Sequence, residues 1–135
     1  MTALRTVYGF FLIAHGLVHT GLAAAPRPDL PGAAPFTFWT RPSWLLEGLG
    51  ESIARPISMA LWIGSTVLFV AAGLGVLGIP GVREIWQGLT IASAVISLLL
   101  LLLIWHPWLI VGALLDVAIL LAILVFKWPP ASIIN

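Results

Sequence analysis

Cysteine is absent from the 135-residue sequence, and charged side chains are scarce. Without a thiol, the chain can form no disulfide, iron–sulfur cluster, thiolate metal site or cysteine nucleophile. Lys and Arg number six and Asp and Glu five, so 8% of the residues are charged and the net charge is +1. Soluble domains carry about 25% charged residues, and a nearly neutral chain offers nucleic acid no cationic surface. These shortages exclude nucleic-acid binding and argue against a water-soluble fold.

Apolar residues are abundant instead, at 61% of the chain against about 45–50% in soluble domains. So few charges cannot cover the surface of a soluble body of this size, whereas lipid tails require no such covering. The composition therefore predicts an all-α integral membrane protein whose immediate partner is the lipid bilayer.

Charge-poor stretches of about 20 residues, the length with which an α-helix crosses about 30 Å of hydrocarbon, occur four times. They predict membrane spans at residues 7–25, 56–78, 84–105 and 107–126. The break at His106-Pro107 is so short that the third and fourth helices must be antiparallel neighbours. The spans, the connection at 26–55 and short turns use residues 1–135, so the sequence predicts a single membrane domain, a four-helix transmembrane bundle.

The first stretch also imitates a signal peptide, because Arg5 precedes an apolar core and Ala23-Ala24-Ala25 is like a cleavage site. Pro26 directly after that site is a poor position for cleavage, and we therefore interpret the stretch as a retained helix.

The membrane orientation rests on a balanced count of cations. Arg5, Arg83 and Lys127 share the side of the termini, and the long connection also carries three arginines. The acidic residues of that connection make it the side more easily translocated, which favours termini in the cytoplasm.

The connection at 26–55 joins a proline-rich lead to a more apolar second half. Ser43 can cap a short helix, and Glu51 to Arg55 is a favourable i,i+4 pair, so we expect a short interfacial helix before the second span. An aromatic-rich segment such as 36–50 is more often a surface anchor than a lid over a cavity. Tryptophans near the span ends fit an aromatic belt at the headgroups: Trp39, Trp44, Trp86, Trp105, Trp108 and Trp128.

Small residues recur at a spacing of four, which brings helices close in lipid. They predict helix contacts, within the bundle or between copies of the chain, at Ala60, Gly64, Ala71, Gly75, Gly88, Ala92 and Gly112. The chain is accordingly expected to form a homo-oligomer or to join a larger membrane complex.

Of the ionisable side chains inside the predicted spans, three are candidates for a function. His15 and His19 share one face of the first helix, and Asp116 lies in the middle of the fourth. An unpaired carboxylate at that depth costs several kcal/mol, so Asp116 must find a partner, and a contact with His15 or His19 is predicted. The three residues are candidates for a structural link, for a proton-exchanging group or for a polar-ligand site.

Metal or haem binding has weaker support. His15 and His19 could share one metal ion only if a third ligand faced them. His106 lies in a turn, at a different depth from His15, which disfavours a bis-histidine haem site. No cofactor is assigned.

The sequence also lacks a phosphate loop, a nucleophile elbow and an HExxH motif, so it predicts no enzyme.

The segments LWIGSTVLFVAAGLGVLGIP (61–80), IASAVISLLLLLLIWHPWLIVGALLDVAIL (91–120) and AHGLVHTG (14–21) resemble an uncharacterised family of small bacterial four-span integral membrane proteins. The chain departs from that pattern at Asp116, where an amide is expected. The resemblance implies a four-helix fold in a bacterial inner membrane and no activity, substrate or cofactor.

Three functions agree with these observations. The first is a non-catalytic scaffold or an accessory subunit of a membrane complex. The second is a small transporter, channel or carrier for protons, a cation or a lipid-like molecule that uses His15, His19 and Asp116. The third is a metal- or haem-binding redox subunit.

Overall fold

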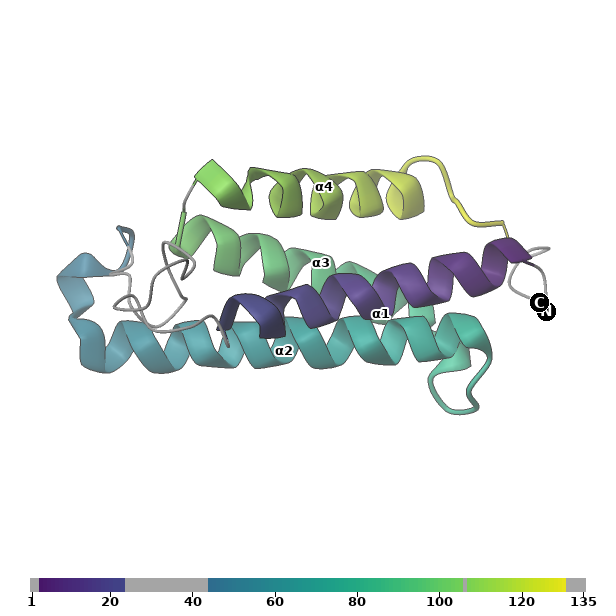
Figure 1. The fold of residues 1–135 in the computed structure, drawn as a ribbon, viewed down its shortest axis with the longest axis horizontal. Coiled ribbons are helices and arrows are strands. Elements are labelled where there is room, and N and C mark those ends of the chain that lie inside the picture. The colour runs from purple at the N-terminus through teal and green to yellow at the C-terminus, as the bar shows by residue number, and fades with distance from the viewer. Residues whose placement is uncertain (1–2, 24–43, 106, 131–135) are drawn as a thin grey trace, which may run out of the picture.

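A computed structural model of the chain describes residues 3–23, 44–105 and 107–130. The described residues form helices and their connections, with no strand among them, as the sequence predicts for an all-α chain. The elements are α1 (Ala3–Ala23), η1 (Glu47–Leu49), α2 (Glu51–Leu77), η2 (Arg83–Ile85), α3 (Trp86–Leu103), η3 (Pro107–Leu109) and α4 (Ile110–Leu124). The four α-helices run alternately in opposite directions (Figure 1). α1 packs on α2, α2 on α3, and α3 on α4.

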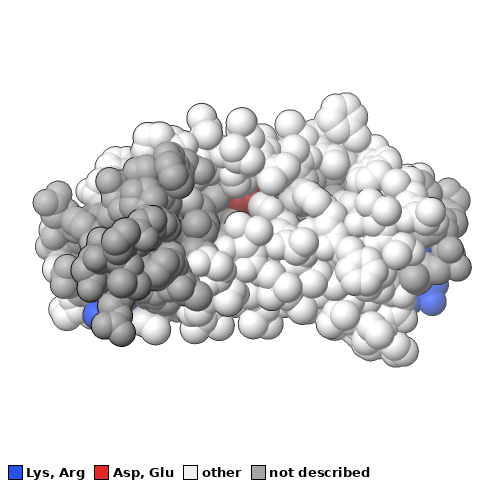
Figure 2. All heavy atoms as spheres, viewed as in Figure 1, with Lys and Arg blue, Asp and Glu red and all other residues white. Residues whose placement is uncertain are grey.

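Two helical stretches, Ser52–Leu77 and Arg83–Leu103, are long and apolar enough to cross a membrane. The helix Ile110–Leu124 is apolar but shorter. Apart from Asp116 in α4 (Ile110–Leu124), the charged residues of the helices lie toward the ends of the bundle. The face in Figure 2 shows Lys and Arg at the two ends and an uncharged surface between them, apart from acidic atoms at the bottom of a hollow.

The start of α2 differs from the sequence-based expectation. Residues 47–49 form one 3₁₀ turn, and α2 begins at Glu51 and runs through Pro56 without a break. The break lies instead at Gly50, whose φ of 77° is strained for any side chain. Pro56 is the sixth residue of α2, so its missing N–H removes one backbone hydrogen bond from the second turn. Residues 51–55, which were expected to end a separate interfacial helix, are therefore the first residues of α2.

The other end of α2 is tied to the start of α1. Gly78 adopts a left-handed conformation, with φ 101°, and its N–H donates to the carbonyl of Gly75 at 2.9 Å. Arg5 donates from Nε to the carbonyl of Val76 at 2.6 Å. A cation at a helix C-terminus is favourable, because the last carbonyl groups have no partners within the helix.

Glycines bring α1 and α2 close together. A Cβ on Gly73 of α2 would lie 2.6 Å from the carbonyl oxygen of Gly9, and a Cβ on Gly16 would lie 2.7 Å from Cβ of Phe69. Only the absence of side chains permits this backbone approach. Gly9 and Gly16 are spaced by seven residues and so lie on one face of α1. The small residues named from the sequence all lie on the other helices, so this contact was not predicted.

The small residues singled out from the sequence occupy varied environments. A Cβ on Gly75 would lie 2.5 Å from the carbonyl oxygen of Val82, and one on Gly112 would lie 3.3 Å from Leu101. A Cβ on Gly64 would lie 3.9 Å from Ile96, and one on Gly88 would meet nothing described within 4 Å. The three alanines are exposed or half-buried: Ala60, Ala71 and Ala92.

The tryptophans that were expected in the aromatic belt and lie among the described residues are near helix ends, with different exposures. Trp44 is 62% exposed and donates from Nε1 to the carbonyl of Leu102 at 2.7 Å. Trp86, by contrast, is buried in the bundle, edge-on to Tyr8. Trp105 is exposed and Trp128 half-buried, and Trp108 belongs to η3. Trp39 and the proline-rich lead lie outside the described residues, as does most of the segment 36–50.

Candidate functional site

A buried hydrogen bond joins the first helix to the last. Nε2 of His15 on α1 lies 2.8 Å from Oδ1 of Asp116 on α4. The side chain of Asp116 is fully buried, and His15 is 8% exposed. The contact predicted between Asp116 and a histidine of the first helix is therefore confirmed, with His15 as the direct partner.

Ser97 of α3 completes the cluster and brings in the second histidine. Its Oγ lies 2.5 Å from Oδ2 of Asp116 and 2.8 Å from Nε2 of His19. Nδ1 of His19 lies 3.1 Å from the carbonyl oxygen of His15, one turn earlier on α1. Ser97 is not among the candidate residues named from the sequence. The signal that could have indicated a polar link is a hydroxyl residue directly before a run of leucines.

Aromatic rings surround the two histidines. Phe69 of α2 meets His15 edge-on at a centroid distance of 4.8 Å, and its ring is nearly parallel to His19 at 6.3 Å. Phe11 is nearly parallel to His15 at 6.0 Å. The cluster of His15, His19, Ser97 and Asp116, called the polar network below, is therefore enclosed by apolar groups, where hydrogen bonds are strong and unpaired polar atoms are costly.

The geometry restricts where protons lie. The carbonyl oxygen of His15 only accepts, so Nδ1 of His19 carries a proton. Ser97 has one proton to donate. If it donates to an Asp116 carboxylate, Nε2 of His19 must donate to Ser97, and His19 is an imidazolium. If Asp116 is instead a neutral acid that donates to Ser97, the serine donates to Nε2 of a neutral His19. Both arrangements hold the same number of protons and differ by shifting two of them along the chain Asp116–Ser97–His19.

The polar network offers little to a metal ion. Among the described residues, no three His, Asp or Glu side chains are grouped to hold one. Both ring nitrogens of His19 and Nε2 of His15 already lie at hydrogen-bonding distance from the atoms given above. Ligation would require breaking these contacts. His106 lies outside the described residues.

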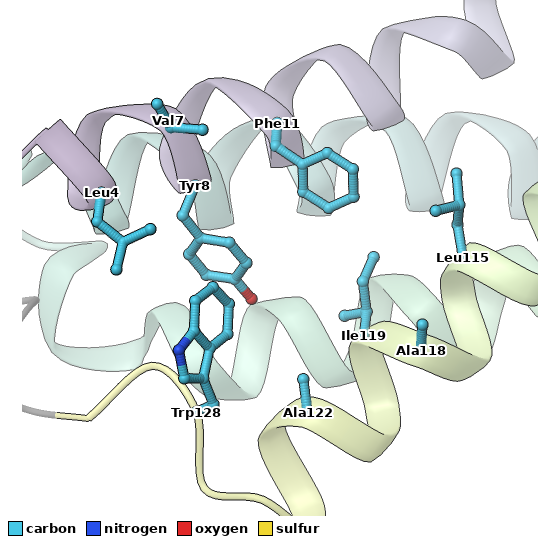
Figure 3. A pocket seen from close by; sticks show the side chains of 9 residues that line it. All are labelled: Leu4, Val7, Tyr8, Phe11, Leu115, Ala118, Ile119, Ala122 and Trp128. Atoms are coloured by element: carbon cyan, nitrogen blue, oxygen red, sulfur yellow. The ribbon is translucent and has the colours of Figure 1, made fainter.

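A cleft of about 320 Å³ lies between α1 and α4, next to the polar network (Figure 3). Its walls are the side chains from Leu4 to Phe11 on one face of α1 and from Leu115 to Ala122 on the facing side of α4. Trp128, after the end of α4, lines it as well. Of the residues that line it, Tyr8 and Trp128 carry a polar side-chain atom, and neither histidine nor Asp116 takes part in it.

No protein-family model, no curated protein and no solved structure matches the chain, which is consistent with the uncharacterised family that residues 61–80 and 91–120 resemble.

Replacing Ser97 tests whether the polar network acts as a unit. We expect Ser97→Ala to lower the free energy of unfolding in detergent by about 1–3 kcal/mol, because Asp116 and His19 lose their shared partner. Ser93→Ala is the matched control. Ser93 is also fully buried on α3, but its hydroxyl donates to the carbonyl of Thr90 in the same helix, at 2.9 Å. We expect that control to cost about 0.5 kcal/mol or less. Equal losses in the two variants would mean that Ser97 acts by packing alone.

Proposed function

We propose that the chain is a four-span integral membrane protein with a non-catalytic role, as an oligomeric scaffold or an accessory subunit of a larger membrane complex. Its place is a bacterial inner membrane, with both termini on the cytoplasmic side.

The dimensions of the helices support four spans. The 21 residues of α1 extend about 32 Å. The three residues of η3 and the 15 of α4 together extend about 28 Å. Both values are close to the hydrocarbon thickness of about 30 Å. Both outer helices also expose large apolar side chains, such as Val7 and Phe10 on α1 and Val111 and Leu114 on α4. These surfaces suit lipid or another apolar helix.

The observation that carries the non-catalytic proposal is the closure of the polar network. Of the ionisable side chains in the middle of the bundle, His15 binds Asp116 directly and His19 binds it through Ser97, and none of them lines the cleft. A conducting path or a catalytic centre needs such groups to face a space that a substrate can enter. Groups that bind one another instead hold helices in a fixed arrangement, as polar links do in membrane bundles.

The absence of cysteine makes the topology directly testable. Single cysteines at Arg83 and Lys127 are expected to react with a membrane-impermeant maleimide from one side of the membrane, and a cysteine at Arg55 from the opposite side. In inside-out vesicles the pattern should reverse. Labelling of Arg55→Cys and Lys127→Cys from the same side would contradict four spans.

The scaffold role is tested by native mass spectrometry of the chain extracted in a mild detergent. We expect a defined multiple of the chain mass, or a complex with another membrane protein. Asp116→Ala is expected to weaken this assembly along with the fold. A monomer that reconstitutes proton or cation flux in vesicles, and loses that flux in Asp116→Asn, would favour the transporter interpretation instead.

A further inference from the structure

We propose that the cleft between α1 and α4 binds one acyl chain of a membrane phospholipid, and that the hydroxyl of Tyr8 donates a hydrogen bond to the ester carbonyl of that lipid. This inference rests on the proposed position of the bundle in a membrane, and it adds a ligand site that the scaffold role does not require.

The hydroxyl of Tyr8 is the feature that calls for a ligand. Tyr8 is only 6% exposed, and its oxygen has no hydrogen-bond partner in the described part of the chain. Figure 3 shows the side chain reaching from α1 across the cleft, with its hydroxyl toward α4 and Trp128. A buried hydroxyl without a partner is costly, and a carbonyl oxygen entering the cleft would supply the missing acceptor.

Neighbouring rings fix the tyrosine in this position. Trp128 meets it edge-on at a centroid distance of 5.0 Å. Trp86, buried at the start of α3, also meets it edge-on, at a centroid distance of 6.1 Å. Phe11 is nearly parallel to it at 6.4 Å. With contacts on three sides, the ring cannot turn outward to reach the headgroup region. The acceptor must therefore come to the hydroxyl.

The size and lining of the cleft select a hydrocarbon chain over a partner helix. An α-helix with its side chains is about 10–12 Å across, so a single turn fills on the order of 400–600 Å³. The cleft holds about 320 Å³ and is lined by aliphatic and aromatic groups. It lies at the low end of the range of about 300–1,000 Å³ for small-ligand sites. An acyl chain is a single carbon chain, much narrower than a helix, so part of its length can lie in the cleft between α1 and α4.

The depth of the cleft matches the geometry of a phospholipid. Tyr8 lies just after Arg5, as the second residue of the stretch 7–25 that is predicted to cross the membrane. That position is near the boundary between headgroups and hydrocarbon, where ester groups lie. Lys127, exposed beside Trp128, brings a positive charge to the same end of the bundle, which suits an anionic phosphate. At the end of the cleft nearest the middle of the bundle, Phe11 stacks on His15. The acyl chain therefore ends where the polar network begins.

The experiment compares the full-length protein, after delipidation in detergent, with and without added dioleoyl phosphatidylglycerol. Native mass spectrometry measures lipid retained per chain, and thermal unfolding measures the stabilisation that the lipid gives. The variants are Tyr8→Phe, which removes the donor, and Ala118→Phe, which fills the cleft. Ala60→Phe makes the same change at an exposed position on α2, away from the cleft, and serves as the control.

We expect one lipid per wild-type chain and a lipid-dependent rise in the unfolding temperature. Tyr8→Phe should bind about 2- to 10-fold more weakly, and without lipid it should unfold at the same temperature as the wild type or a higher one, because it removes an unpaired buried hydroxyl. Ala118→Phe should lose the retained lipid, and Ala60→Phe should keep it.

Three outcomes would overturn the proposal. In the first, the wild-type chain retains no stoichiometric lipid. In the second, Ala60→Phe loses lipid as fully as Ala118→Phe. In the third, Ala118→Phe changes the oligomer mass while lipid binding is unchanged, which would place a second copy of the chain in the cleft. The maleimide labelling separates these failures from failure of the four-span proposal, because it reports topology whether or not a lipid binds.

Discussion

Asp116→Ala is expected to lower the free energy of unfolding of the chain in detergent by about 3–5 kcal/mol, the loss typical of removing one partner from a buried pair. Asp116 is fully buried and meets His15 with one carboxyl oxygen and Ser97 with the other. Alanine leaves both partners without their hydrogen bonds and leaves a cavity at the centre of the bundle. Equilibrium unfolding in a mild detergent, followed by circular dichroism, measures the loss.

Asp116→Asn separates the hydrogen bonds from the charge. The amide oxygen can accept from Nε2 of His15, and the amide NH₂ can donate to Ser97, which then donates to His19. These are the bonds of the uncharged proton arrangement, which avoids burying ions among apolar groups. We therefore expect Asp116→Asn to cost about 1 kcal/mol or less, as volume-conserving changes do. A loss as large as that of Asp116→Ala would show that the carboxylate and an imidazolium form the native arrangement.

A double-mutant cycle supplies the control for both variants. His15→Ala combined with Asp116→Ala should destabilise less than the sum of the single changes, because the two side chains share one hydrogen bond. Phe126→Ala, at a position that is 73% exposed, should add to Asp116→Ala without coupling. No coupling between His15 and Asp116 would contradict the contact at 2.8 Å.

Most of the helix pattern could be predicted from the sequence because long apolar stretches and Gly/Pro turns are local signals. The four stretches correspond to the four α-helices, and the turn at Gly78 ends α2 as expected. The start of α2 was wrong by five residues. Pro56 imitated a helix start, whereas Gly50 is the residue whose backbone requires a break. A proline near a helix N-terminus is compatible with either boundary.

The candidate site could be predicted only in part, because it depends on which helix faces meet. Asp116 had to find a partner for energetic reasons alone, and the spacing of His15 and His19 placed both on one face. The link through Ser97 could not be predicted, since three helices must be placed in register before its hydroxyl reaches both neighbours. The cleft and the buried hydroxyl of Tyr8 likewise follow from the separation of α1 and α4, which no local pattern encodes.

Gly73→Leu is expected to destabilise the bundle by at least about 3 kcal/mol, at or beyond the upper end of the usual loss from overpacking. A Cβ at this position would lie 2.6 Å from the carbonyl oxygen of Gly9 and 2.6 Å from Cγ1 of Ile13, and the rest of a leucine needs still more room. Since one of these atoms belongs to the backbone of α1, no rotamer change relieves the contact. The two helices must separate.

Gly88→Leu makes the same substitution on α3 where an added Cβ meets no described atom within 4 Å. In a monomer it should change stability by about 0.5 kcal/mol or less, because surface changes are usually small and leucine favours helix more than glycine does. The difference between the two leucine variants, measured by unfolding in the same detergent, isolates the close approach of α1 and α2. If Gly73→Leu were as stable as the wild type, α1 could not lie this close to α2, and His15, carried by α1, would lose the position from which it reaches Asp116.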